Sequence, residues 1–279
     1  MLLGNTLVWP IIRWAMHRGA RPEAVGICVT AVAAPVGVLV ALFTGQDLFL
    51  PVTLTLGAVG GITWALGFAL IIFYCLKIGP AGPTVTINNL GLLWPVTIGM
   101  VWFSRGQALS PLALAGVIST VLALVLVGWN RSKKEGSARL TGEWAKWVLI
   151  GWLSAGINMS SQLLQSQYAP DHPFVYMAVF YGTALTILLV ISLIKRNGRL
   201  RREEVIAGTS TGIMVAGLLP LMEILLTRMS AAIVFPVAVA GPAALTLLMG
   251  HFMFRERLSA AGWAASMLGV TGIILLSPW

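Results

Sequence analysis

Apolar segments of nearly constant length recur along the whole chain, separated by short stretches that contain charges, glycine or proline. A helix needs roughly 20 apolar residues to cross a bilayer. Segments of about this length occupy 2–17, 23–43, 52–76, 84–103, 111–129, 144–167, 173–194, 204–228, 232–254 and 259–277. They do not alternate as barrel strands do, and lipid otherwise admits only helices. The pattern predicts an all-α, polytopic membrane protein with ten transmembrane helices.

The longest polar connector divides the chain almost in half. Gln107-Ala-Leu-Ser-Pro aligns with Glu256-Arg-Leu-Ser-Ala at an offset of 149 residues, and Pro22 aligns with Pro173 at an offset of 151. We therefore predict a first five-helix repeat over 1–130, a basic linker over 131–143 and a second repeat over 144–279. An odd number of helices per repeat inverts one half relative to the other, as in many secondary transporters.

Composition and charge agree with a bilayer environment. The chain is 58% hydrophobic and only 10% charged, and its mean hydropathy is +0.89. The net charge of +9 could suggest nucleic acid, but sixteen of the 18 Lys and Arg fall in the odd-numbered loops or at the helix ends beside them. Such a bias is topogenic and marks cytoplasmic loops. We expect a multi-pass protein of the inner (plasma) membrane, no nucleic-acid partner, and both termini outside.

One carboxylate falls inside a predicted helix. Glu223 lies roughly 9 Å from the helix end at Met229, at 1.5 Å per residue, whereas the other eight carboxylates lie in loops or at helix ends. Carboxylates inside a membrane are costly and usually face a cavity or a partner. Glu223 is therefore a candidate gate or proton-coupling site; the alternative is a structural partner for a hydroxyl or for Arg228.

Amides form a stripe on the sixth predicted helix. Asn158, Gln162 and Gln165, with Ser154 and Ser161, fall within an arc of about 100°. This face should meet protein or water, and its amides can bind a polar solute. Contacts between helices are an equally good explanation.

Tryptophans occur near the middle of three predicted helices, away from the interfaces where they are usual. Trp9, Trp64 and Trp94 could stack on a sugar, an aromatic metabolite or a cation, or simply pack against neighbours. Asn88, one turn into the fourth helix, could line the cytoplasmic mouth or only satisfy the helix start. With the stripe, these residues are the candidate contacts of a small-molecule substrate.

Enzyme signatures are lacking. There is no HExxH, Walker A, CxxC or nucleophile-elbow motif, and the three histidines lie near predicted helix ends. We expect no catalytic residue, metal or cofactor. Transport by alternating access is the preferred function, and an intramembrane lipid-modifying enzyme is the alternative from another class.

Short motifs resemble a known family. Phe254-Arg-Glu-Arg-Leu-Ser, Gly269-Val-Thr-Gly-Ile-Ile-Leu-Leu and Tyr74-Cys-Leu-Lys-Ile-Gly are similar to EamA-type permeases of the drug/metabolite transporter superfamily. Gly60-Gly-Ile-Thr-Trp-Ala-Leu-Gly resembles its sugar-uptake branch.

The resemblance implies secondary transport of a small metabolite, with multidrug or cation export as an alternative. It also implies that the fifth and tenth helices form a scaffold or a homodimer contact while the others surround a cavity. Members usually have both termini in the cytoplasm, so the resemblance and the charge count give opposite orientations.

Overall fold

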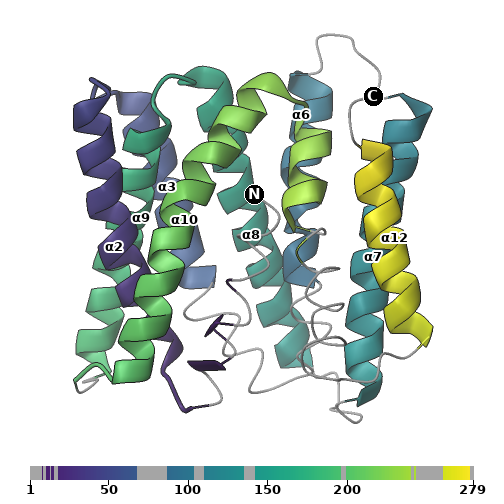
Figure 1. The fold of residues 1–279 in the computed structure, drawn as a ribbon, viewed down its shortest axis with the longest axis horizontal. Helices are drawn as coiled ribbons and strands as arrows, with labels where there is room; N and C mark the ends of the chain where they lie inside the picture. Colours follow the sequence, from purple (N-terminus) through teal and green to yellow (C-terminus); the bar gives the residue numbers. More distant parts are fainter. Residues whose placement is uncertain are drawn as a thin grey trace. The chain divides into compact units, whose positions relative to one another are not determined.

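The described part of the chain is entirely helical (Figure 1). The computed structural model describes residues 8, 11–12, 14–15, 18–67, 87–103, 110–134, 142–195, 199–239, 242 and 260–276. No strand occurs among these residues. The predicted all-α class is confirmed for this part, whereas most of the first predicted helix, with Trp9, and residues 243–254 of the ninth lie outside it.

The helices have the following bounds: α2 Pro22–Phe43, α3 Pro51–Leu66, the short 3₁₀ helix η2 Leu90–Leu92, α6 Leu93–Trp102, α7 Pro111–Lys134, α8 Gly142–Tyr168, α9 Pro173–Ile194, α10 Arg202–Arg228 and α12 Ala260–Leu276. Residues 231–239 are helical as well. Proline is the first residue of α2, α3, α7 and α9, where its fixed φ suits a helix and its missing N–H costs nothing.

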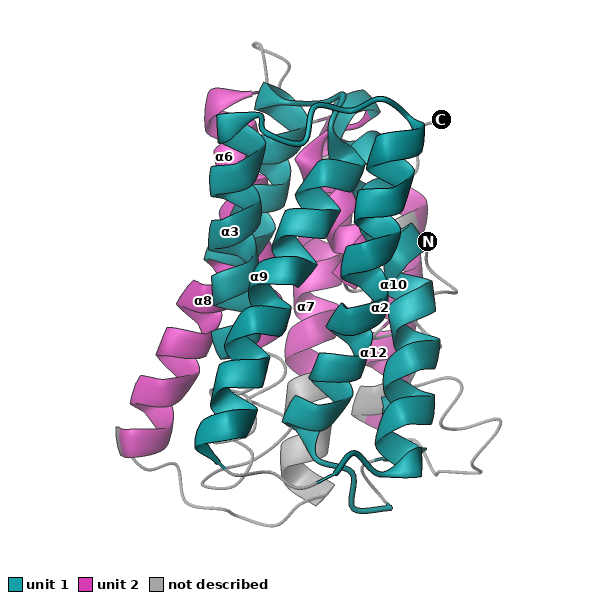
Figure 2. Cartoon of the chain, turned by 90° about the vertical axis from the view of Figure 1, so that its left-hand side faces the viewer, with its two compact units in different colours: residues 1, 3–70, 157–228 teal, residues 2, 71–156, 229–279 magenta. Residues whose placement is uncertain are grey.

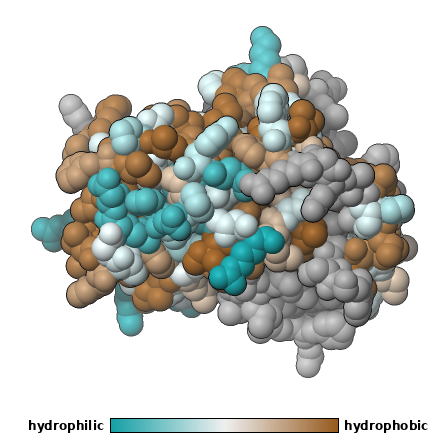
Figure 3. Space-filling model, turned by 90° about the horizontal axis from the view of Figure 1, so that it is seen from above, coloured by the Kyte–Doolittle hydropathy of each residue, from teal (hydrophilic) through white to brown (hydrophobic). Residues whose placement is uncertain are grey.

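Three helices, α2, α9 and α10, are long and apolar enough to cross a membrane. Large apolar side chains on their outer faces are exposed, among them Leu42, Leu193 and Ile213. In the end-on view, hydrophilic side chains gather over the helix ends while apolar ones lie around them (Figure 3). These features indicate a membrane protein. The number of spans stays a prediction.

The chain divides into two compact units, each assembled from two separate stretches (Figure 2). Unit 1 takes residues 1, 3–70 and 157–228, and unit 2 takes residues 2, 71–156 and 229–279. Both units therefore combine helices from the two predicted repeats. The predicted boundaries 1–130, 131–143 and 144–279 rest on the internal alignment alone, and α7 continues to Lys134, inside the predicted linker.

In unit 1, α9 packs against both α2 and α3, and α10 packs against α2. The core of this packing is aromatic on the α9 side, with Tyr176, Phe180 and Tyr181. Small residues of α2 and α10 face these rings, including Ala33 and Ala216. Large rings against alanines allow close helix approach, which is the usual mode of packing between membrane helices.

Glycines bring α3 into contact with α9. A Cβ on Gly57 would lie 2.9 Å from Val179 Cβ, and one on Gly61 would overlap the backbone carbonyl oxygen of Phe180. By contrast, a Cβ on Gly182 of α9 would meet no atom within 4 Å. The close approach of these two helices therefore depends on the α3 glycines.

We expect Gly61→Ala to lower the free energy of unfolding by about 1–3 kcal/mol, because the added methyl group overpacks the contact with rigid backbone. The matched control, Gly182→Ala, should be neutral or stabilise by up to about 1 kcal/mol, since alanine favours a helix over glycine. Thermal unfolding of the detergent-solubilised variants measures both. Equal stability of the two variants would contradict the observed approach of α3 and α9.

Unit 2 is built around the pair α7 and α12. Thr120 and Leu124 of α7 are buried, as is Ala265 of α12. A Cβ on Gly272 would lie 2.6 Å from the Thr120 side chain. These are the fifth and tenth predicted helices, and they pack on each other within one chain.

Candidate functional site

Glu223 is buried in α10, with 2% of its surface exposed. Neither carboxylate oxygen has a hydrogen-bond partner within the described part of the chain. Pro220, three residues earlier in the same helix, has no N–H to continue the helical ladder. Within the described residues, neither a hydroxyl group nor Arg228 forms a hydrogen bond with the Glu223 carboxylate, as the alternative required. A buried carboxylate without a hydrogen-bond partner is costly, so none of the described residues accounts for Glu223 as a stabilising contact.

Tyr176 of α9 is the neighbouring polar group. It is fully buried and close enough to Glu223 for the two groups to interact electrostatically. Its hydroxyl lies 2.9 Å from Ser161 Oγ of α8. Ser161 donates its single proton to the carbonyl oxygen of Asn158 at 2.7 Å, so Tyr176 donates to Ser161. The Tyr176 proton is thus directed to α8 and not to Glu223.

Gly60 of α3 leaves the room for this hydroxyl pair. A Cβ at Gly60 would lie 2.6 Å from Ser161 Oγ and 2.9 Å from the Tyr176 hydroxyl oxygen. Any side chain at this position would displace the pair. Residues of α3, α8 and α9 therefore meet at one polar point inside unit 1.

The amide stripe of α8 is largely buried in unit 1, and its members differ in their contacts. Gln165 is fully buried and donates to Thr53 Oγ1 of α3 at 3.2 Å and to the Ala169 carbonyl at 2.9 Å. Gln162 donates to Asn158 Oδ1 at 3.3 Å, one helical turn away. Gln165 thus ties two helices together, whereas Gln162 and Asn158 pair with each other, and Asn158 is only half-buried.

Trp64 belongs to the aromatic core of unit 1. Its ring centroid lies 6.2 Å from that of Phe180 and 6.0 Å from that of Tyr181, with an edge-on angle of 84° to the latter. Such tilted geometries are favourable aromatic contacts. The indole is half-buried, so packing accounts for much of its surface.

Two of the predicted contact residues lie in unit 2. Trp94 of α6 packs against Trp152 of α8, with ring centroids 5.4 Å apart and ring planes tilted by 60°. Gly156 leaves room for the Trp94 indole, since a Cβ there would lie 2.5 Å from it. The indole N–H is buried and has no partner among the described residues. Asn88 is half-buried in a helical segment. Glu223, the three amides and Trp64 thus all belong to unit 1, while Trp94 and Asn88 belong to the other unit.

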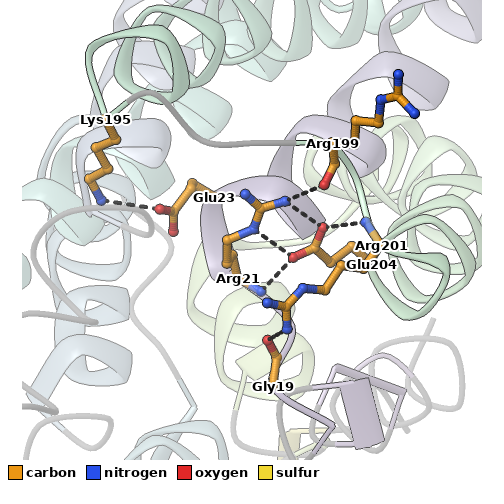
Figure 4. Close-up of polar contacts among 7 residues, drawn as sticks. All are labelled: Gly19, Arg21, Glu23, Lys195, Arg199, Arg201 and Glu204. Atoms are coloured by element: carbon orange, nitrogen blue, oxygen red, sulfur yellow. Dashed lines mark hydrogen bonds and ion pairs between the residues drawn. The ribbon is translucent and has the colours of Figure 1, made fainter.

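A second buried glutamate, Glu204, was missed by the sequence reasoning. It lies in the first turn of α10 and has no exposed surface. Its carboxylate accepts the Nε and Nη2 groups of Arg21, each at 2.9 Å (Figure 4). It also accepts the backbone N–H of Arg21 at 2.9 Å and that of Arg201 at 2.8 Å.

Arg21 and Arg201 each precede a helix, so one carboxylate caps the N-termini of both α2 and α10. Glu204 stands three residues after Arg201, as the acid of a capping box does. This spacing is the local signal that the sequence contains. The hydrogen bonds that Arg21 donates to Glu204 raise the pKa of Arg21. Glu23, which accepts from Lys195 Nζ at 3.2 Å, adds a second link at the same end.

Other features of the described residues do not suggest a different site. Among them, no group of three or more His, Cys, Asp or Glu is placed to hold a metal ion. A largely apolar hollow of about 450 Å³ is lined by Pro51, Val52, Thr55, Leu56, Leu164 and Tyr168. None of the candidate site residues lines it.

Comparisons with known proteins establish the fold and nothing about activity. No family model matches the chain. No curated protein matches it either. A solved structure named only "Crystal structure of protein" is similar over 98% of this chain and 94% of its own length, with a TM-score of 0.79 and 19% identity. The chain shares that fold over essentially its whole length.

Proposed function

We propose that the chain is a secondary transporter of the inner membrane, with ten transmembrane helices in two inverted halves, which moves a small polar or amphipathic metabolite by alternating access. The observation that carries the proposal is the buried, unpartnered carboxylate of Glu223 beside Tyr176. Three membrane-length helices agree with it.

In the proposed mechanism Glu223 alternates between two states. While it is enclosed, a charge without a partner costs several kcal/mol, so the carboxyl group holds a proton or a cationic group of the solute. When water reaches it, the ion can leave. The free energy of this exchange is what couples solute movement to an ion gradient.

The solute contacts proposed in unit 1 are Asn158 and Gln162. Among the described residues, these amides form a side-chain hydrogen bond only with each other, so a solute can exchange with that bond at little cost. Gln165 acts as a tie between α8 and α3. Trp9, Trp64, Asn88 and Trp94 stay sequence predictions for the remaining contacts.

The first experiment identifies the solute. Purified protein is screened by thermal shift against sugars, amino acids, nucleosides and cationic drugs, and each stabilising compound is tested for uptake into proteoliposomes. If no compound that binds is taken up, the transport proposal fails.

Asn158→Ala and Gln162→Ala should each weaken apparent affinity for that solute about tenfold, the loss expected for one hydrogen bond of about 1.4 kcal/mol. The control is Gln165→Ala, which should lower the unfolding temperature and leave affinity nearly unchanged. Uptake kinetics and thermal unfolding separate the two effects. Unchanged affinity and rate in both variants would contradict the assignment of Asn158 and Gln162 as solute contacts.

A cation exporter of the same architecture is the second candidate. The Glu223 carboxylate, which has no hydrogen-bond partner among the described residues, interacts electrostatically with Tyr176, whose ring packs with those of Phe180 and Tyr181. This arrangement also suits an organic cation, through charge and cation–π attraction. The same screen distinguishes the two, because an exporter binds the cationic drugs and ignores neutral metabolites.

A further inference from the structure

Unit 1 carries an excess of positive charge where α2 and α10 begin and α9 ends. We call the exposed surface formed by Arg18, Arg199 and Arg202 the basic surface. Arg201 is also exposed there and donates to the Gly19 carbonyl at 3.0 Å. Its links with Gly19, and that of Arg21 with the Arg199 carbonyl, hold segments 18–21 and 199–204 side by side (Figure 4).

The nearby carboxylates do not neutralise the basic surface. Glu204 is taken by Arg21 and two backbone amides, and Glu23 by Lys195. Only Glu203, which is half-buried, remains as a counter-charge in this segment. In the described part, Arg18, Arg199 and Arg202 form no ion pair with a carboxylate. Guanidinium groups that form no ion pair with a carboxylate can bind a phosphate group through two parallel N–H···O hydrogen bonds.

Exposed apolar side chains lie at the same ends of α9 and α10. Leu193 and Ile194, at the end of α9, are 76% and 75% exposed, and Val205 and Ile206 follow Arg202 in α10 with 41% and 43% exposed. The guanidinium carbon of Arg18 lies 4.7 Å above the ring of Trp14, and tryptophan favours the level of lipid headgroups. A soluble anion would use only the charges. A phospholipid would use the charges and the apolar side chains together.

We propose that the basic surface binds the phosphate headgroup of an anionic phospholipid, whose acyl chains lie against Leu193, Ile194, Val205 and Ile206. Arg18, Arg199 and Arg202 supply the donors, and the Arg21–Glu204 pair holds the two segments that present them. The site requires only that the chain lies in a membrane and does not depend on what it transports.

The test uses the purified full-length protein in detergent. Its unfolding temperature is measured against added phosphatidylglycerol, phosphatidylcholine with the same acyl chains, and inorganic phosphate. We expect phosphatidylglycerol to stabilise the protein and the other two to have little effect. Equal stabilisation by phosphatidylcholine would overturn charge recognition, and equal stabilisation by inorganic phosphate would overturn the lipid as the ligand.

Variants then locate the site. Arg199→Gln and Arg202→Gln should each weaken phosphatidylglycerol binding about fivefold, since one cation near an anionic surface contributes about 1 kcal/mol. Arg228→Gln is the matched control, because Arg228 is an exposed arginine at the other end of α10. Native mass spectrometry of retained lipid reads out binding directly. An equal loss in Arg228→Gln, or none in the other two, would overturn the proposal.

Discussion

Glu223→Met should raise the thermal stability of the purified protein while removing ion-coupled transport. Methionine has a similar volume, and it removes two buried oxygens that have no hydrogen-bond partner among the described residues. An unsatisfied buried polar group costs about 1–3 kcal/mol, so the free energy of unfolding should rise by that order. A gain in stability with a loss of function is typical of residues kept for activity.

The control for this variant is Ile224→Met, which places the same side chain on the adjacent, 37% exposed position. It should change stability little and leave transport intact. Thermal unfolding in detergent, followed by uptake assays in proteoliposomes, measures both properties. A marked loss of stability in Glu223→Met would mean that the carboxylate has a stabilising partner.

Glu204→Gln should have the opposite effect on stability, although Glu204 is a buried glutamate of the same helix. Its carboxylate accepts four hydrogen bonds from Arg21 and Arg201. The glutamine side chain has no charge, and its NH₂ group would face the N–H donors of Arg21 and Arg201. Breaking a buried ion pair by changing one partner costs about 3 kcal/mol, and the ends of α2 and α10 lose a shared cap.

Glu203→Gln is the matched control for Glu204→Gln. It makes the same charge change at the preceding residue, which is half-buried, and should leave the unfolding temperature nearly unchanged. The double variant Arg21→Gln with Glu204→Gln should lose less stability than the two single variants together. In the double variant both charges are removed, so no charged group is left without its partner. Equal stabilities of the two glutamine variants would contradict the capping role of Glu204.

The apolar pattern predicted the long helices well. The predicted segments 23–43, 173–194 and 204–228 agree within two residues with α2, α9 and α10, because length, proline and flanking charge are local signals. The end of α7 was not predictable in this way. The segment was expected to end at 129, but α7 continues to Lys134, because charged residues at a helix end do not stop the helix.

The candidate site was predictable only in part. Glu223 is evident as a lone carboxylate in an apolar segment, but its missing partner depends on how α10 is rotated toward α9. The pair Arg21 and Glu204 joins residues 183 positions apart, which no local pattern connects. Charge counting assigned Arg21 to topology, and Glu204 was placed only among the carboxylates in loops or at helix ends. Tyr176 is one of five hydroxyl-bearing residues in the segment 173–194, and no local pattern distinguishes it from the others.

The most direct test of the central claim is a proton-flux measurement on Glu223. Wild-type protein and Glu223→Gln are reconstituted into vesicles that contain a pH-sensitive dye, and the solute identified by the screen is added outside. We predict that solute uptake changes the internal pH for the wild type, whereas the variant exchanges solute across the membrane without moving protons. An unchanged, solute-dependent pH response in Glu223→Gln would contradict the account.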